Sequence, residues 1–271
     1  MSTGAPPTRV PFPGRRPRVF GHRGAAGVAP ENTLVSFNRA LADGADVLEL
    51  DVHATSDGEI VVLHDATLER TTDGAGPVAS HTWNEIARLD AGFHFTPDGG
   101  RTFPFRGRGV GIPRLTDLLR ECPRVPLNVE IKQPEPPIVE AVVALVRGTN
   151  ARVLLAAELD PIMQQIRATA PDIPTSLAAG EVAAFIAAVQ SGAPPTLPPG
   201  AVALQIPPRY GNVTLVDAAT LAAAHGLGAE LHVWTINDVD EMRRLLDLGC
   251  DGIMSDFPAR VRVVVNEARR G

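Results

Sequence analysis

The sequence is poor in cysteine, in aromatic residues and in long apolar runs. Its 271 residues include 2 cysteines, 1 tyrosine and 2 tryptophans, and aromatic side chains make up 4% of the chain. Cys122 and Cys250 form no CxxC pair and no disulfide framework, so we expect two small buried side chains. Charges, prolines and glycines interrupt every apolar stretch well before about 18 residues, so we expect no transmembrane helix.

Net positive charge is also missing. The chain has 25 Lys and Arg against 31 Asp and Glu, a formal net charge of −6. This balance argues against nucleic acid or an anionic membrane surface as the main partner, and any positive charge in a site must be local. Residues 1–16 contain several prolines and no apolar run of signal-peptide length, which predicts a disordered or surface arm and a cytoplasmic location.

Apolar runs alternate with amphipathic stretches along residues 17–271. Predicted strands start near residues 18, 47, 126, 153, 174, 202, 230 and 252, and predicted helices such as 115–121 and 239–248 lie between them. Eight parallel strands that alternate with helices close as an α/β fold of the TIM (β/α)8 barrel type, with its chemistry at the carboxyl ends of the strands. A doubly wound open sheet is the alternative.

One long segment, residues 66–113, breaks this alternation. It is rich in glycine, contains the turn cluster TTDGAG and offers one short helix around residues 83–89. A structureless loop of this length is unusual in a compact domain unless it is functional. We therefore predict a small inserted subdomain that follows the hairpin of the second strand and caps the site.

That hairpin, residues 47–65, reads VLELDVHATSDGEIVVLHD. Its period of two places Glu49 and Asp51 on one face of a strand, and the turn residues around 55–58 predict an antiparallel return strand. Two registers fit, with His64 opposite Glu49 or opposite Asp51, and both place His64 on the carboxylate face. Two buried carboxylates need a cation or a proton, so we interpret the hairpin as half of a metal site with an acid/base partner.

Polar residues also follow the first, third, seventh and eighth predicted strands. The ends of the first three strands are neighbours in a barrel, and with the hairpin they bring seven groups to one mouth: Glu49, Asp51, Glu130, Arg23, Lys132, His22 and His64. Three hard oxygen ligands suit Mg²⁺ or Ca²⁺. An Arg and a Lys beside a divalent ion serve phosphoryl chemistry, and two histidines can divide the proton transfers. These residues predict phosphodiester or phosphomonoester chemistry.

Simpler interpretations stand beside this one. The three acids could form a salt-bridge network with Arg23 and Lys132, although one negative charge would stay unpaired, which favours a cation. The histidines could be structural. Trp234 could pack in the core or line a substrate pocket, and Asp256 and Asn237 could support the site or only cap strand ends.

Seven segments in order resemble the glycerophosphodiester phosphodiesterase family. They are GHRG at 21–24, PENT at 30–33, LELDVHATSDGEIVVLHD at 48–65, RTTDGAG at 70–76, NVEIK at 128–132, VWTIN at 233–237 and DGIMSDFP at 251–258. The resemblance implies a TIM barrel with a small inserted subdomain. It also implies hydrolysis of glycerophosphodiesters to sn-glycerol 3-phosphate and an alcohol, within glycerol and lipid metabolism.

By similarity, the resemblance also assigns roles. The proposed ligands of Mg²⁺ or Ca²⁺ are Glu49, Asp51 and Glu130; the general acid and base are His22 and His64; the substrate contacts are Arg23, Lys132 and Trp234. The family's route, in which the glycerol 2-hydroxyl attacks phosphorus and water opens the cyclic phosphate, and direct attack by water both remain open. So do the order of the two histidines, the head group, the cation and the oligomeric state.

Two other functions fit the same motifs. One is a lysophospholipase D-like hydrolase that acts on a related diester. The other is a barrel that binds phosphodiesters without catalysis, although such a protein would be expected to lack a histidine or a ligand carboxylate, and none is missing here.

Overall fold

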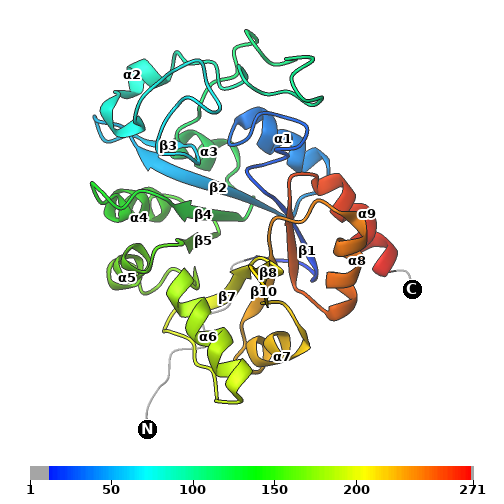
Figure 1. Cartoon of the computed structure of the whole chain (residues 1–271). Helices are drawn as coiled ribbons and strands as arrows, with labels where there is room; N and C mark the ends of the chain where they lie inside the picture. Colours follow the sequence, from blue (N-terminus) through cyan, green and yellow to red (C-terminus); the bar gives the residue numbers. More distant parts are fainter. Residues whose placement is uncertain (1–11, 270–271) are drawn as a thin grey trace.

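Eight parallel strands close into a TIM barrel, which confirms the predicted fold (Figure 1). The computed structural model describes residues 12–269. The barrel strands are β1 (Arg18–Gly21), β2 (Val47–Ala54), β4 (Leu127–Ile131), β5 (Val153–Ala156), β6 (Thr175–Ser176), β7 (Ala201–Ile206), β10 (Glu230–Val233) and β11 (Gly252–Ser255). Each strand pairs in parallel with the next, and β1 pairs with both β11 and β2, so the sheet has no open end.

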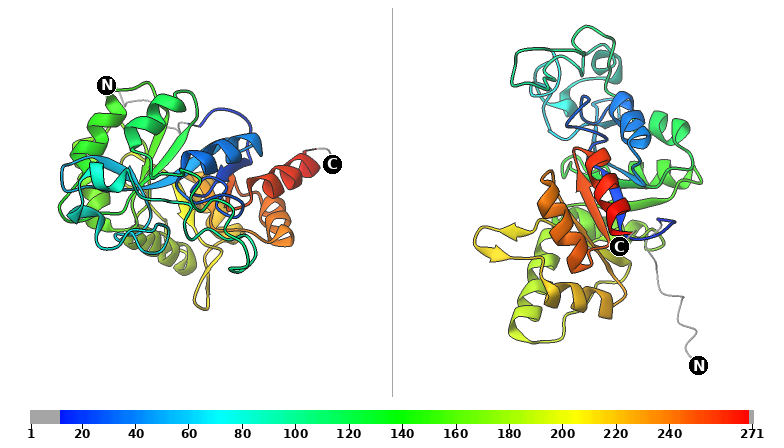
Figure 2. Two further views of the ribbon diagram at one scale, coloured as in Figure 1. Left: turned by 90° about the horizontal axis from the view of Figure 1, so that it is seen from above. Right: turned by 90° about the vertical axis from the view of Figure 1, so that its right-hand side faces the viewer.

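Helices cover the outside of this barrel (Figures 1 and 2). They are α1 (Leu34–Ala42), α3 (Leu115–Glu121), α4 (Val139–Arg147), α5 (Asp160–Thr169), α6 (Ala179–Ser191), α7 (Ala218–Gly226), α8 (Val239–Leu248) and α9 (Pro258–Ala268). In α8 the Asp238 side chain caps the first turn and Gly249 ends the helix in a left-handed conformation. Within residues 12–269, none of the helices has the length and hydropathy to cross a membrane.

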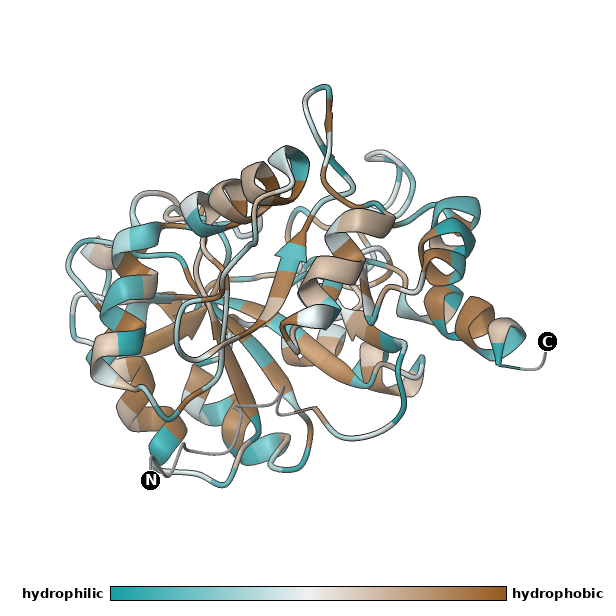
Figure 3. Ribbon diagram, turned by 90° about the horizontal axis from the view of Figure 1, so that it is seen from below, coloured by the Kyte–Doolittle hydropathy of each residue, from teal (hydrophilic) through white to brown (hydrophobic). Residues whose placement is uncertain are grey.

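The strands bury both of their faces. Leu48, Leu50 and Val52 of β2 pack outward in the cluster beneath the helices, while Val47 belongs to the cluster inside the barrel. Glu49 lies on the same face as Val47, because side chains alternate along a strand. Figure 3, which is turned by 90° from the view of Figure 1 and so shows the barrel from the side, has apolar strands in the centre and mixed polar and apolar helices around them.

An apolar side chain closes the amino-terminal end of the barrel. Phe12 is buried and packs edge-on against Phe20, with ring centroids 5.5 Å apart, and its carbonyl accepts a hydrogen bond from Arg18. The predicted arm, residues 1–16, therefore includes part of the barrel core. Residues 1–11 of that arm lie outside the described part of the chain.

The β2–β3 hairpin has a register that we did not expect. β3 (Ile60–Val62) pairs antiparallel with β2, and Val62 lies opposite Val52. A backbone bond between 55 and 59 leaves residues 56–58 as the turn, with Gly58 at a φ of +87°. Both predicted registers are wrong. They assume a turn with an even number of residues, and a turn of three residues shifts the strand pairing by one residue. His64 reaches the carboxylates only because the chain leaves β3 after Val62.

Residues 66–113 extend beyond the barrel (Figure 1) and are mostly irregular. They contain the 3₁₀ helix η1 (Val78–Ser80) and the short helix α2 (Trp83–Ile86). Their apolar side chains join the hairpin in a separate cluster: Val61, Leu63, Leu68, Val78, Ile86, Ala91, Val110 and Ile112. A second hairpin, which the sequence did not predict, consists of β8 (Arg209–Tyr210) and β9 (Val213–Thr214).

The buried position of Phe12 predicts a loss of stability on truncation. Phe12→Ala should lower the free energy of unfolding by about 3 kcal/mol, because it opens a cavity beneath the barrel. Urea denaturation measures this change. Val35→Ala, at a residue that is 40% exposed, is the control and should have little effect. Equal stability of Phe12→Ala and the parent protein would show that this segment is a surface arm after all.

Candidate active site

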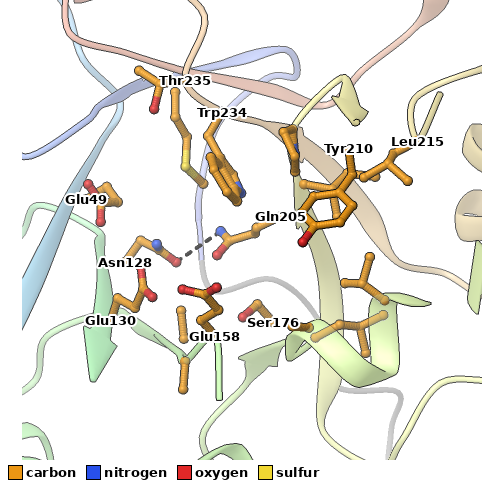
Figure 4. A pocket seen from close by; sticks show the side chains of 18 of the residues that line it. Glu49, Asn128, Glu130, Glu158, Ser176, Gln205, Tyr210, Leu215, Trp234 and Thr235 are labelled. Carbon is orange, nitrogen blue, oxygen red and sulfur yellow. Dashed lines mark hydrogen bonds between the residues drawn. The ribbon is translucent and has the colours of Figure 1, made fainter. Parts of the chain in front are cut away.

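One cavity of about 710 Å³ opens at the carboxyl ends of the barrel strands. Each side chain that the sequence predicted for the site lines it: His22, Arg23, Glu49, Asp51, His64, Glu130, Lys132 and Trp234. Parallel strands end at the same rim of a barrel, so residues up to 212 positions apart in the chain meet there. Figure 4 shows several of these side chains pointing into the cavity.

Three carboxylates form the centre of the polar end of this cavity. One oxygen atom from each of Glu49, Asp51 and Glu130 lies within 4.8 Å of the other two. Glu49 and Asp51 are two residues apart on β2 and share its inner face. The parallel register of β2 and β4 places Glu130 beside Asp51. The strand pairing therefore assembles the cluster.

The charges of this cluster do not balance. Burial and the charge of Asp51 raise the pKa of Glu49 to about 8, and the same two causes raise the pKa of Glu130. Lys132 Nζ lies 2.9 Å from Glu130 Oε1, and Arg23 Nε lies 3.2 Å from Asp51 Oδ2. Three carboxylates face two cations, so the third carboxylate needs a proton or a further cation, in agreement with the raised pKa of Glu49. The all-oxygen donor set suits Mg²⁺ or Ca²⁺, which would supply the missing charge.

Two residues in uncommon backbone conformations direct donors at these carboxylates. Arg23 and Asn32 have φ values of +50° and +56°. The Arg23 backbone N–H donates to Glu49 at 2.8 Å, and the Asn32 side-chain amide donates to Asp51 at 2.9 Å. Left-handed backbone conformations cost free energy and occur most often at functional sites. Asn32 was not among the predicted site residues, because the sequence does not reveal its positive φ.

A carboxylate holds His22 in place. His22 Nδ1 lies 2.7 Å from Asp256 Oδ1, and Asn237 donates to the other oxygen of Asp256 at 2.6 Å. Burial lowers the pKa of His22, but the Asp256 hydrogen bond and the charge of Glu49 raise it by more, so the net pKa is above its ordinary value. Asn237 also accepts from the backbone N–H of Asp256, so it both caps the strand end and supports the site.

A carboxylate also holds His64, which follows β3 directly before the insertion. Its Nδ1 lies 2.6 Å from Asp65, which binds Arg70. Arg70 also donates to Glu31, and Glu31 binds Arg23 at 2.9 Å. The hydrogen bond from Arg70 lowers the pKa of Asp65 to about 2. This network connects the two ends of the site. Asp65, Arg70 and Glu31 were not predicted as site residues, although Arg70 opens the motif RTTDGAG.

Trp234 lines the cavity and does not pack in the core. Its side chain is 41% exposed and points into the hollow (Figure 4). Below it, Gln205 donates a hydrogen bond of 3.0 Å to Asn128, and both amides line the cavity. The wall across the cavity from Glu49 and Glu130, formed by α6 and the β8–β9 hairpin, carries mainly apolar side chains (Figure 4).

Comparison with known proteins identifies the family. A sequence model of the glycerophosphoryl diester phosphodiesterase family matches residues 22–260. A glycerophosphodiester phosphodiesterase from Caldanaerobacter subterraneus is 31% identical over 264 residues, which cover 93% of this chain and 98% of that protein.

Two crystal structures show the same fold. A glycerophosphodiester phosphodiesterase from Agrobacterium tumefaciens has a TM-score of 0.71 and 28% identity, over 91% of this chain and 99% of that one. A glycerophosphoryl diester phosphodiesterase domain from Mycobacterium tuberculosis has a TM-score of 0.82 and 23% identity, over 93% and 99% of the two chains. With a family match over most of its length, the chain is an enzyme of the glycerophosphoryl diester phosphodiesterase family.

Proposed function

We propose that this protein is a metal-dependent phosphodiesterase that hydrolyses glycerophosphodiesters to sn-glycerol 3-phosphate and an alcohol. One observation carries the proposal: a three-carboxylate cluster, flanked by Arg23 and Lys132, shares a cavity with two histidines that are each held by a carboxylate. The family match supports the substrate class.

The polar end of the cavity fits a phosphate diester. Glu49, Asp51 and Glu130 would hold Mg²⁺ or Ca²⁺, which when bound supplies positive charge beside the non-bridging oxygens of the phosphate. Arg23 and Lys132 already face the carboxylates at 3.2 and 2.9 Å. They would donate to the same phosphate oxygens and stabilise the charge that develops there in the transition state.

The two histidines would move the protons. Because Asp256 and Asp65 bind the Nδ1 atoms, Nε2 of each imidazole is the nitrogen left for the substrate. One neutral imidazole accepts the proton of the attacking hydroxyl, and the other, as imidazolium, gives a proton to the oxygen of the leaving alcohol. The attacking group is either the glycerol 2-hydroxyl, through a cyclic phosphate that water then opens, or water itself. These residues serve both routes.

The non-catalytic alternative finds less support. Both histidines and all three carboxylates are present and line one cavity, which a binding protein would not need. A binding protein would hold glycerophosphocholine with a divalent cation and release no glycerol 3-phosphate. The cytoplasmic location expected from the sequence stays a prediction.

Removing either imidazole tests the assignment of the catalytic pair. His22→Ala and His64→Ala should each lower kcat on glycerophosphocholine by about 10² to 10⁴-fold. A p-nitrophenyl diester of glycerol phosphate releases p-nitrophenolate, which departs without a proton. This substrate should therefore restore turnover to the variant that lacks the general acid and not to the variant that lacks the base. Steady-state assays with both substrates make the comparison. Wild-type turnover in either variant would remove that histidine from the mechanism.

Removing one carboxylate oxygen tests the metal site. Glu130→Gln and Asp51→Asn should weaken the binding of Mg²⁺ or Ca²⁺ by about tenfold or more, because each removes a charged ligand. Calorimetric titration with each ion measures this loss. The matched control is Glu158→Gln, since Glu158 lines the same cavity but lies outside the three-carboxylate cluster. If the control loses as much affinity as the ligand variants, the cluster is not the binding site.

The hydrogen bond between Asp256 and His22 predicts a shift in the pH profile. Asp256 raises the pKa of His22, so Asp256→Asn should lower it, and this effect persists when a cation neutralises Glu49. If His22 is the general acid, the alkaline limb of kcat/KM moves to lower pH; if it is the base, the acidic limb does. A pH–rate profile measured at a saturating metal concentration shows whether His22 is the acid or the base. If neither limb of kcat/KM moves, His22 does not titrate in the reaction.

A further inference from the structure

A row of hydrogen-bonded polar side chains runs through the inside of the barrel and ends at the cavity. Its members, in order, are Arg18, Glu230, His232, Gln205 and Asn128, from strands β1, β10, β7 and β4. Only the last two line the cavity. Apolar side chains usually fill the interior of such a barrel, and buried polar groups cost free energy unless they are paired. The row therefore indicates a role besides packing.

His232 stands in the middle of this row and has no freedom to turn. Its side chain is fully buried, and its ring centroid lies 4.7 Å from that of Phe20. Gly252, on the neighbouring strand, leaves the room for both rings. A Cβ atom at Gly252 would lie 2.5 Å from the Phe20 ring and 3.0 Å from Cδ2 of His232. Since the core holds the imidazole in place, each of its two nitrogens keeps a fixed partner.

Glu230 determines which of these nitrogens carries the proton. Burial raises the pKa of Glu230, but the hydrogen bond from His232 and the charge of Arg18 lower it by more, so the net pKa is below its ordinary value. An ionised carboxylate only accepts, so His232 Nε2, at 3.0 Å, is the N–H that donates to it. Arg18 already balances the charge of Glu230, and a second buried cation would be unpaired. The imidazole is therefore neutral, and its Nδ1 is an acceptor.

This acceptor fixes the orientation of the Gln205 amide. Gln205 Nε2 donates to His232 Nδ1 at 3.3 Å and to Asn128 Oδ1 at 3.0 Å, which uses both of its hydrogens. Within residues 12–269, Gln205 Oε1 and Asn128 Nδ2 have no protein partner. One free acceptor and one free donor therefore belong to two bonded amides that both line the cavity (Figure 4).

The two amides lie next to the carboxylate cluster. The parallel register of β2 and β4 places Asn128 beside Glu49, and Asn128 shares the inner face of β4 with Glu130, two residues further on. A substrate whose phosphate lies at the carboxylates therefore brings its glycerol hydroxyls to the amides. A hydroxyl both donates and accepts, which matches one free acceptor beside one free donor.

We propose that His232 is a positioning residue, which orients the amides of Gln205 and Asn128 so that together they bind one hydroxyl of the substrate's glycerol. The proposal rests on the proposed function and names a contact by which the site recognises glycerol. His232 does not touch the substrate and acts through Gln205. A compound without that hydroxyl would leave both amides unpaired, so the pair selects against it.

Binding of three small phosphates tests the amide pair without turnover. The probes are sn-glycerol 3-phosphate, 2-hydroxypropyl phosphate and 3-hydroxypropyl phosphate, and each of the last two lacks one glycerol hydroxyl. Calorimetric titration in the presence of Ca²⁺ measures their affinities. One of the two analogues should bind the wild-type protein about fivefold or more weakly than glycerol 3-phosphate, because it loses the hydrogen bonds to the amides. If all three phosphates bind equally, or none binds, the proposal is wrong.

A matched pair of glutamine variants assigns this difference to Gln205. Gln205→Leu should weaken glycerol 3-phosphate about fivefold and leave the affected analogue unchanged, so that the difference disappears. Gln190→Leu is the control, because Gln190 lines the same cavity from α6 and is not part of the row. The difference must persist in the control. Its survival in Gln205→Leu, or its loss in both variants, would contradict the proposal.

Two substitutions of His232 separate positioning from packing. Asn places its oxygen at the level of Nδ1, where it can accept from Gln205, whereas Gln places its amide at the level of Nε2, where it can donate to Glu230. Both remove the ring. His232→Asn should keep the difference between glycerol 3-phosphate and the affected analogue, and His232→Gln should lose it. Equal results in the two variants would show that His232 only fills the core.

The wild-type protein offers a test that needs no variant. The ¹⁵N chemical shifts of the His232 imidazole report which nitrogen carries the proton, and we expect Nε2. A proton on Nδ1 would require Gln205 to face the ring with its oxygen and would overturn the proposal. The outcome for the proposed function is separate. Selective binding of glycerol 3-phosphate by a protein that hydrolyses no glycerophosphodiester would support the amide pair and refute the hydrolase, and hydrolysis with equal binding of the three phosphates would do the opposite.

Discussion

The arrangement of the site depends on the electrostatic cost of placing three carboxylates side by side at the mouth of the barrel. Burial and mutual repulsion raise the pKa values of Glu49 and Glu130. The neighbouring groups reduce this cost: Lys132, the guanidinium and backbone N–H of Arg23, and the amide of Asn32 all contact the cluster. Two of these residues keep left-handed backbone conformations to do so, which indicates a site retained for function at the expense of local stability.

Much of this arrangement follows from the sequence because periodic patterns report local structure. Helices α3 and α8 have the bounds that the apolar periodicity predicts. Alternation along β2 places both of its carboxylates inside the barrel, and parallel pairing with β4 brings Glu130 to them. The predicted site residues meet because the carboxyl ends of parallel strands share one rim, which is a property of the topology and not of any single contact.

The features that were missed depend on contacts between distant residues or on the conformation of a single residue. The hairpin register depends on the number of residues in the turn, which the pattern TSDG does not fix. The bond between Arg70 and Glu31 joins positions 39 residues apart in the chain. Phe12 lies in a proline-rich segment that resembles a tail, yet it fills the barrel end because Phe20 and His232 leave an aromatic surface there. No local pattern encodes such contacts.

The cavity is chemically divided, and the division follows the architecture. The charged residues and the two histidines stand on β2 and β4 or directly after β1, β3 and β4, whereas α6 and the β8–β9 hairpin supply a wall with little charge. Backbone pairing fixes the first group, since moving one of its strands would disturb the barrel. The second group is a helix face and a loop-like hairpin, whose side chains can differ without altering strand register. The half of the cavity that carries the charged groups is therefore held by the barrel itself, whereas the side chains of the other half can differ without disturbing those groups.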